Sequence, residues 1–182
     1  MEIIILTAVI LIIGISVLQY NKLIKLNIQV DEAFAQIEVQ LKRRADLIPN
    51  LVETIKGYAA HEKEALEKVV KARASATSAS TLSEISAADG FLTNALKGLL
   101  AVAEAYPDLK ASSNFLQLQE ELANTENQVA FSRQFYNDSV RSLNTSVKQV
   151  PTNIFAPLAK VKLRDFYELT DPAERKSPNV NF

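Results

Sequence analysis

The sequence has no cysteine, no tryptophan and only one histidine. Without cysteine it cannot form disulfides, thiolate metal sites or thiol nucleophiles, and one histidine cannot supply a site that needs several imidazoles. Most hydrolytic and redox enzyme designs are thereby excluded. Only 4 glycines and 6 prolines in 182 residues favour helix over sheet. Because 20 basic residues are balanced by 21 acidic ones, we expect no nucleic-acid partner.

The N-terminal stretch is the strongest local signal, since residues 3–18 carry no charge and only Thr7, Gly14 and Ser16 interrupt the apolar run. At ~1.5 Å per residue, the segment through Tyr20 covers roughly 27 Å, close to the ~30 Å hydrocarbon thickness of a bilayer. We therefore predict a single-pass transmembrane anchor in residues 1–21. The residues expected in the lipid are Ile3, Ile4, Ile5, Leu6, Val9, Ile10, Leu11, Ile12, Ile13, Gly14, Ile15, Val17 and Leu18.

Two alternatives for this run are a cleaved secretory signal and a buried soluble helix. No basic region precedes the run and no small-residue cleavage site follows it, which disfavours a signal. A soluble helix of this composition would need burial on every side, more than a chain of this size provides. Lys22 and Lys25 follow the run and Glu2 precedes it, so the positive-inside tendency predicts a cell-membrane protein with its N-terminus outside and its C-terminal domain cytoplasmic.

After the anchor, apolar residues recur at helical spacing from Leu23 to Ile48, which predicts one helix from the membrane to about Asp46. Pro49 is expected to end or kink that helix because proline has no amide hydrogen to donate, with Asp46 capping a second helix. The stretch 74–80 is small and polar, and is predicted to be a frayed helix end and loop. The apolar face expected on the second helix comprises Leu51, Ile55, Tyr58, Leu66, Val69 and Ala72.

A capping box at Thr81 and Glu84 predicts the start of a third helix, which Pro107 should stop. Its expected buried residues are Phe91, Ala95, Leu99, Val102 and Tyr106. Asp108 or Ser112 can cap a fourth helix, which should stop before Pro151. Its expected stripe is Phe115, Leu118, Leu122, Val129, Tyr136, Val140, Leu143 and Val147.

Four amphipathic helices with short connections predict an all-α fold, in which the N-terminal transmembrane helix is continuous with a long antiparallel four-helix bundle. The bundle is assigned to residues 22–150. Residues 151–182 hold four of the prolines and are predicted to be an extended tail, with a short ordered piece at Phe166 and Tyr167.

The segment AFAQIEVQLKRRADLIPNLVETIKGYAAHE (residues 33–62) closely resembles a signature of the LemA family of bacterial membrane-anchored proteins. Residues 100–137, the Gln-Tyr-Asn at 19–21 and the ending RDFYELTDPAERKSPNVNF are similar to further family segments. Blocks of this length are far more specific than a short motif. The resemblance implies a single-pass anchor with the N-terminus outside, a helical bundle and no established catalytic activity. Residues 26–28 and 159–161 depart from the family pattern.

Two groups of polar residues are candidate sites. His61 lies beside acidic residues, but neighbouring positions of a helix face different ways, so a metal would need ligands from elsewhere. The second group can form an interhelical polar network or a ligand site, or a buried pair that sets helix register, which we favour. It comprises the basic run Lys42, Arg43 and Arg44 with Glu126 and Arg133. The run can instead bind anionic lipid or an acidic partner, although roughly 30 Å of upright helix separates it from the membrane.

We therefore expect a non-enzymatic interaction or scaffold protein, with no catalytic residue, cofactor or metal. Its expected partners are the lipid bilayer, further copies of itself and an unidentified protein. Homo-oligomerisation is suggested by Gly14 and Ser16 in the anchor and by an Ala- and Gln-rich flank after it. The alternatives are a lipid-handling membrane module and a metal-dependent enzyme that uses His61.

Overall fold

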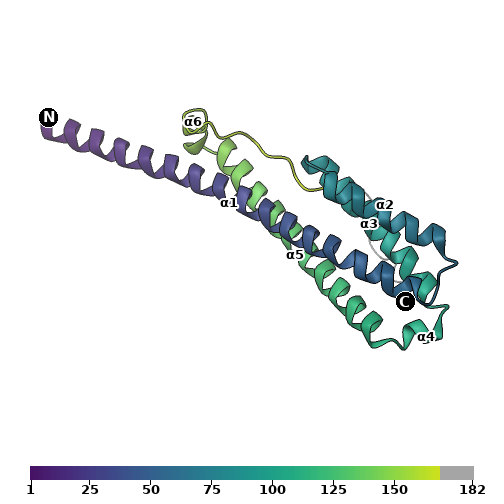
Figure 1. The fold of residues 1–182 in the computed structure, drawn as a ribbon. Coiled ribbons are helices and arrows are strands. Elements are labelled where there is room, and N and C mark those ends of the chain that lie inside the picture. The colour runs from purple at the N-terminus through teal and green to yellow at the C-terminus, as the bar shows by residue number, and fades with distance from the viewer. Residues whose placement is uncertain (169–182) are drawn as a thin grey trace, which may run out of the picture. The chain divides into compact units, whose positions relative to one another are not determined.

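A computed structural model describes residues 1–168, and every regular element in that part of the chain is a helix (Figure 1). The prediction of an all-α fold with a long apolar N-terminal helix is confirmed. The part of the predicted tail in residues 169–182 lies outside the described residues. The helices are α1 (Glu2–Lys56), α2 (Lys63–Ser78), α3 (Leu82–Ala103), α4 (Pro107–Lys110), α5 (Ser113–Lys148) and α6 (Thr152–Phe155).

The chain forms two compact units, and the long helices α1 and α5 each contribute to both. Unit 1 consists of residues 1–37 and 132–166, and here the two long helices pack on each other, with Phe34 and Tyr136 in ring contact. Unit 2 contains residues 38–131 and the described residues 167–168. In unit 2, segments of α1, α2, α3 and α5 share one apolar core. Its most deeply buried residues include Ile48, Leu51, Ile55, Val69, Leu92, Leu99 and Leu109.

Buried residues on both long helices recur every seven positions, which keeps them on one helix face because two turns take ~7.2 residues. On α5 the buried row is Phe115, Leu122, Val129, Tyr136 and Leu143, as the predicted stripe required. On α1 it is Leu23, Val30, Ile37, Arg44 and Leu51. A second buried row on α5 consists of the hydroxyl residues Thr125, Ser132, Ser139 and Ser146, whose small side chains permit close approach of a neighbouring helix.

Of the two outcomes expected at Pro49, an end of the helix is wrong, because α1 continues through it to Lys56. A proline at this position cannot bond the carbonyl of Ala45, four residues earlier. That carbonyl instead accepts a hydrogen bond of 2.9 Å from the Arg73 side chain of α2. Apolar residues before and after the proline, such as Ile48 and Leu51, are fully buried in the unit 2 core. Tertiary contacts therefore compensate for the missing bond, and no new helix begins at Asp46.

The second and third helices also differ from the predicted ones. The chain turns after α1, and α2 begins only at Lys63 and continues to Ser78, so most of the expected loop at 74–80 is helical. On α3, Leu92, Leu96 and Leu99 are buried, whereas the predicted core residue Phe91 is 44% exposed. This helix has apolar residues on more than one side, so its periodicity alone does not select the buried face.

The start of α3 matches its prediction in detail. The Thr81 side chain accepts a hydrogen bond from the backbone of Glu84, and the Glu84 carboxylate accepts one from the backbone of Thr81. The same carboxylate also accepts from the backbone amide of Ser80. These hydrogen bonds stabilise the charged form of Glu84, and the bond from the Ser80 backbone has the largest effect. Together they lower the pKa of Glu84 from 4.5 to about 2.

The segment after α6 is held against both long helices in unit 1. The Asn144 side chain makes two hydrogen bonds with the backbone of Arg164, of 2.8 and 2.9 Å. The Arg164 guanidinium in turn pairs with Asp31 of α1 at 2.6 Å and donates to Asn27. The short helix α6 was not part of the sequence prediction.

Candidate functional site: a buried arginine cluster

Arg44 is the centre of a polar cluster inside unit 2. Although it occupies an otherwise apolar row of α1, only 4% of it is exposed. Its guanidinium Nη1 lies 3.2 Å from the Asp89 carboxylate and donates to the Thr93 hydroxyl at 3.0 Å, both on α3. Nη2 lies 2.6 Å from the Glu126 carboxylate on α5. One guanidinium therefore joins three helices by charge-assisted contacts.

The C-terminal segment takes part in the same cluster. The Tyr167 hydroxyl donates to the second oxygen of Asp89 at 2.8 Å, and the ring is buried. One helical turn before Asp89, the Ser86 hydroxyl donates to the backbone carbonyl of Glu168. The face of α3 formed by residues 86, 89 and 93 therefore contacts both Arg44 and residues 167–168.

The chemistry of this cluster suits assembly better than catalysis. Asp89 is 2% exposed, and each of its oxygens already contacts a donor. A carboxylate so enclosed is not positioned to accept a proton from a substrate. The fork of Arg44 is satisfied only when α1, α3 and α5 are in one register, which is the well-attested use of a polar residue in an apolar row.

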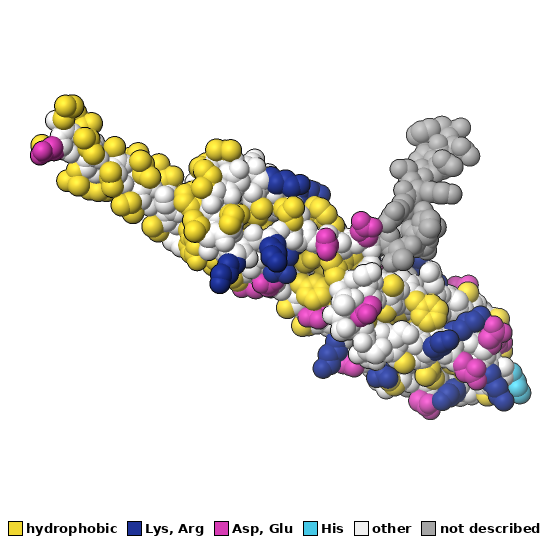
Figure 2. All heavy atoms as spheres, turned by 90° about the horizontal axis from the view of Figure 1, so that it is seen from above, with side chains coloured by type: hydrophobic (Ala, Val, Ile, Leu, Met, Phe, Trp, Pro, Cys, Tyr) yellow, Lys and Arg dark blue, Asp and Glu magenta, His cyan; other side chains and the backbone are white. Residues whose placement is uncertain are grey.

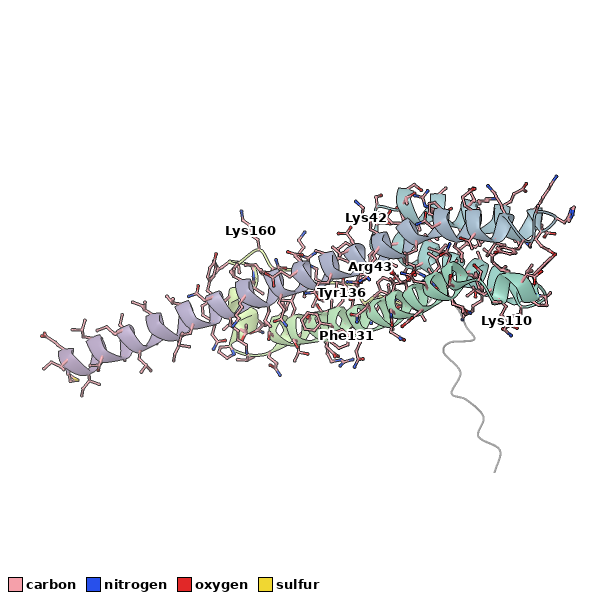
Figure 3. All side chains as sticks on the ribbon, turned by 60° about the horizontal axis from the view of Figure 1, so that its bottom comes forward. Lys42, Arg43, Lys110, Phe131, Tyr136 and Lys160 are labelled. Atoms are coloured by element: carbon pink, nitrogen blue, oxygen red, sulfur yellow. The ribbon has the colours of Figure 1, made fainter. Side chains whose placement is uncertain are left out.

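The other basic members of the predicted network lie at further positions on α1 and α5. Lys42 and Arg43 are exposed on α1 (Figure 3), and Lys42 borders a groove of about 380 Å³ between α1 and the end of α2. Arg133 is half-buried and belongs to unit 1. Within the basic run, Arg44 is the residue that contacts Glu126.

His61 is exposed in the turn between α1 and α2. Its neighbour Glu62 accepts a hydrogen bond of 2.9 Å from the Tyr106 hydroxyl, and this bond raises the pKa of Tyr106. Within residues 1–168, no group of three or more His, Asp or Glu side chains is close enough together to hold a metal ion.

Sequence reasoning missed Asp89, Thr93 and the contact of Tyr167 with the cluster. The burial of Arg44 could have been predicted from the sequence. It lies seven residues after Ile37 and seven before Leu51, a spacing that places it on the same helix face as these core residues. Asp89 and Thr93 are four residues apart, the spacing that places two side chains on one helix face. Nothing local indicates that they face Arg44.

The residues predicted to lie in lipid all belong to the first part of α1. Their large apolar side chains are between 42% and 79% exposed. By length and composition α1 is the one helix in the described part of the chain that is able to cross a membrane. Figure 2 shows this part of the helix covered with apolar side chains up to its N-terminal end.

The sequence matches one protein family and several known proteins. The LemA family model matches residues 33–182. Magnetosome protein MamQ 2 of Paramagnetospirillum magneticum is 22% identical, over 88% of this chain and 69% of its own length. Protein LemA of Metamycoplasma hominis is 27% identical, over 75% of this chain and 63% of its own length. The family model therefore spans the arginine cluster, α5 and the part of α1 after residue 32.

Proposed function

We propose that this chain, which belongs to the LemA family, is a membrane-anchored interaction protein that uses its helical units to hold partners at the bilayer. The observation that carries the proposal is the apolar run at residues 3–18, which is helical yet uncovered by the rest of the described chain. Exposing so many large apolar side chains to water is strongly unfavourable, and a bilayer removes that cost.

The polar side chains within the run support insertion. The Thr7 hydroxyl donates to the carbonyls of Ile3 and Ile4, and the Ser16 hydroxyl donates to that of Ile12. In lipid every polar group needs such a partner, because no water is present to replace it. The anchor thus satisfies its own hydrogen bonds and needs no second helix to do so.

Membrane extraction tests the anchor. The full chain should stay with the membrane pellet after washing at high salt and alkaline pH, whereas a variant with Leu11→Lys and Ile12→Lys should be released. The matched control is Val70→Lys with Phe131→Lys, two exposed apolar positions of unit 2, which should leave the chain in the pellet. Release of the unaltered chain would refute the proposal.

The orientation belongs to the same proposal. Lys22 and Lys25 follow the run and Glu2 precedes it, which supports a cytoplasmic position for residues 22–182 with the N-terminus outside. Protease added to spheroplasts reaches only the outer face of the cytoplasmic membrane, so it should leave residues 22–182 intact. Digestion with a cytoplasmic control protein left intact would reverse the orientation.

Self-association is the form of interaction we propose first. Confinement to a membrane raises the effective concentration of copies, so weak contacts suffice. Gly14 and Ser16 offer small residues where two spans can approach, and a Cβ added at Gly14 meets no atom of the described chain within 4 Å. Single-molecule photobleaching in native-membrane discs should show several steps per particle. A population that bleaches in one step would remove the homo-oligomer, and crosslinking in intact membranes would then seek a different protein partner.

A further inference from the structure

The short helix α6 and its flanks form an apolar row that the fold leaves uncovered. Val150, Ile154 and Leu158 are 78%, 63% and 69% exposed, respectively. Between them, Thr152 and Ala156 are buried within unit 1. The backbone bond from Ala159 to Phe155 extends helical geometry beyond the end of α6, and the bond from Asn153 to Gln149 closes the turn before it. Residues spaced by four share a face, so Ile154 and Leu158 lie on the outer face and Thr152 and Ala156 on the inner one.

This row lies at the end of the proposed membrane span. The Thr152 hydroxyl donates to the Gln19 side chain of α1 at 2.9 Å. Gln19 follows Leu18, the last residue of the apolar run. Figure 1 shows α6 beside α1 at the place where the uncovered part of that helix begins. If the run fills the hydrocarbon layer, residue 19 and everything bonded to it lie at the boundary between acyl chains and headgroups.

Charge is arranged to match that position. Lys148 precedes the row and Lys160 follows it, and both are exposed. Lys160 extends away from the helices (Figure 3). On the surface of the molecule, lysine and arginine side chains lie beside the apolar patch at the base of the uncovered helix, with acidic side chains near them (Figure 2). Apolar residues flanked by lysine are typical of segments that lie in the plane of a membrane surface and contact anionic headgroups.

We propose that the row Val150, Ile154 and Leu158 inserts into the interfacial layer of the bilayer, with Lys148 and Lys160 against anionic headgroups. It forms a second membrane contact beside the span. The inference rests on the proposed anchor, because the span sets the depth of Gln19 and hence of α6. Two contacts at one interface fix the tilt and rotation of unit 1 on the membrane, which a single helix leaves free.

The absence of native tryptophan allows a direct test in the full chain. Single-tryptophan variants Ile154→Trp and Leu158→Trp are reconstituted into phosphatidylcholine vesicles with or without phosphatidylglycerol, and lipids brominated near the headgroup serve as quenchers. Leu11→Trp reports on the span, and Val70→Trp on α2 is an exposed apolar control outside unit 1. All four positions are exposed, so the larger side chain fits without disturbing the core. Circular dichroism confirms that each variant is folded.

We expect blue-shifted emission and loss of intensity for residues 154 and 158 with shallow bromines, stronger when phosphatidylglycerol is present. Residue 11 should be quenched by lipids brominated deep in the acyl chain, and residue 70 by neither. Unquenched emission at 154 and 158 with residue 11 quenched would overturn the inference and leave the anchor standing. A blue shift without quenching would also overturn it, since protein would then cover the row. Equal quenching without phosphatidylglycerol would remove the headgroup contact. An unquenched residue 11 would refute the anchor and the inference together.

Discussion

The substitution Arg44→Met tests whether the buried arginine cluster holds unit 2 together. It removes the contacts of the guanidinium with Asp89, Thr93 and Glu126 while keeping an unbranched side chain of helix-favouring type. Asp89 then stays enclosed at 2% exposure with the Tyr167 hydroxyl as its remaining donor among these contacts. An enclosed carboxylate that loses its cation has no water to replace it.

The magnitude follows from the burial of each partner. Removing one member of a buried ion pair costs about 3–5 kcal/mol of unfolding free energy. The contact with Glu126 adds little, because that side chain is 38% exposed and pairs with solvent access contribute about 0–1 kcal/mol. We therefore expect about 3–5 kcal/mol for Arg44→Met and under about 1 kcal/mol for Glu126→Gln.

The adjacent residue provides a matched control. Arg43 is the same residue type on the same helix but is exposed, so Arg43→Met should change the unfolding free energy by no more than about 0.5 kcal/mol. Urea unfolding of the full chain in detergent micelles, followed by the helical circular dichroism signal, measures both. The double variant Arg44→Met with Asp89→Leu should cost less than Arg44→Met alone, because no buried charge is then left uncompensated.

The refuting result is equally direct. If Arg44→Met lowers the unfolding free energy no more than Arg43→Met does, the cluster does not stabilise unit 2. If the double variant loses as much unfolding free energy as Arg44→Met and Asp89→Leu lose separately when added together, Arg44 and Asp89 do not depend on each other. The geometry has then been misinterpreted.

Three further outcomes are expected. NMR titration should give the Glu84 carboxyl a pKa of about 2, and the stability it contributes should be present above about pH 4.5 and lost as the pH falls toward 2; an ordinary pKa would contradict the cap described at Ser80 and Thr81. Tyr167→Phe should lower the unfolding free energy by about 1.5–3 kcal/mol in urea, since a buried carboxylate loses a donor, and an unchanged midpoint would show the contact to be dispensable. Arg73→Met should cost about 1 kcal/mol by the same assay, because a carbonyl of α1 loses its donor, while an exposed lysine of α2 changed to Met should cost nothing measurable.

Patterns that depend on neighbours in sequence were predictable. The apolar run, the box that caps α3 and the buried row of α5 each express their signal within a few turns of helix. Such features require only helical periodicity and the hydrogen-bonding needs of helix ends. They fix the fold class and the two long helices.

Features that depend on a distant residue were not predictable. Pro49 was expected to end or kink a helix, and the donor that compensates for its missing hydrogen bond is on another helix. Phe91 and Leu92 are both apolar, and only the packed neighbours determine which one is buried. At the cluster, Arg44 was among the candidates, but Asp89 became its partner through contacts 45 residues apart in sequence. Contacts between residues far apart in the sequence cannot be predicted from local patterns of residues.

The bond between Arg73 and the carbonyl of Ala45 also has a consequence for synthesis. Arg73 is added 24 positions after Pro49. At ~5–20 residues per second, about 1–5 s pass on the ribosome before the donor exists, and longer before α2 has emerged and docked. During that interval the last turns of α1 have neither their carbonyl partner nor their core. The C-terminal end of α1 is therefore completed by a helix that is synthesised after it.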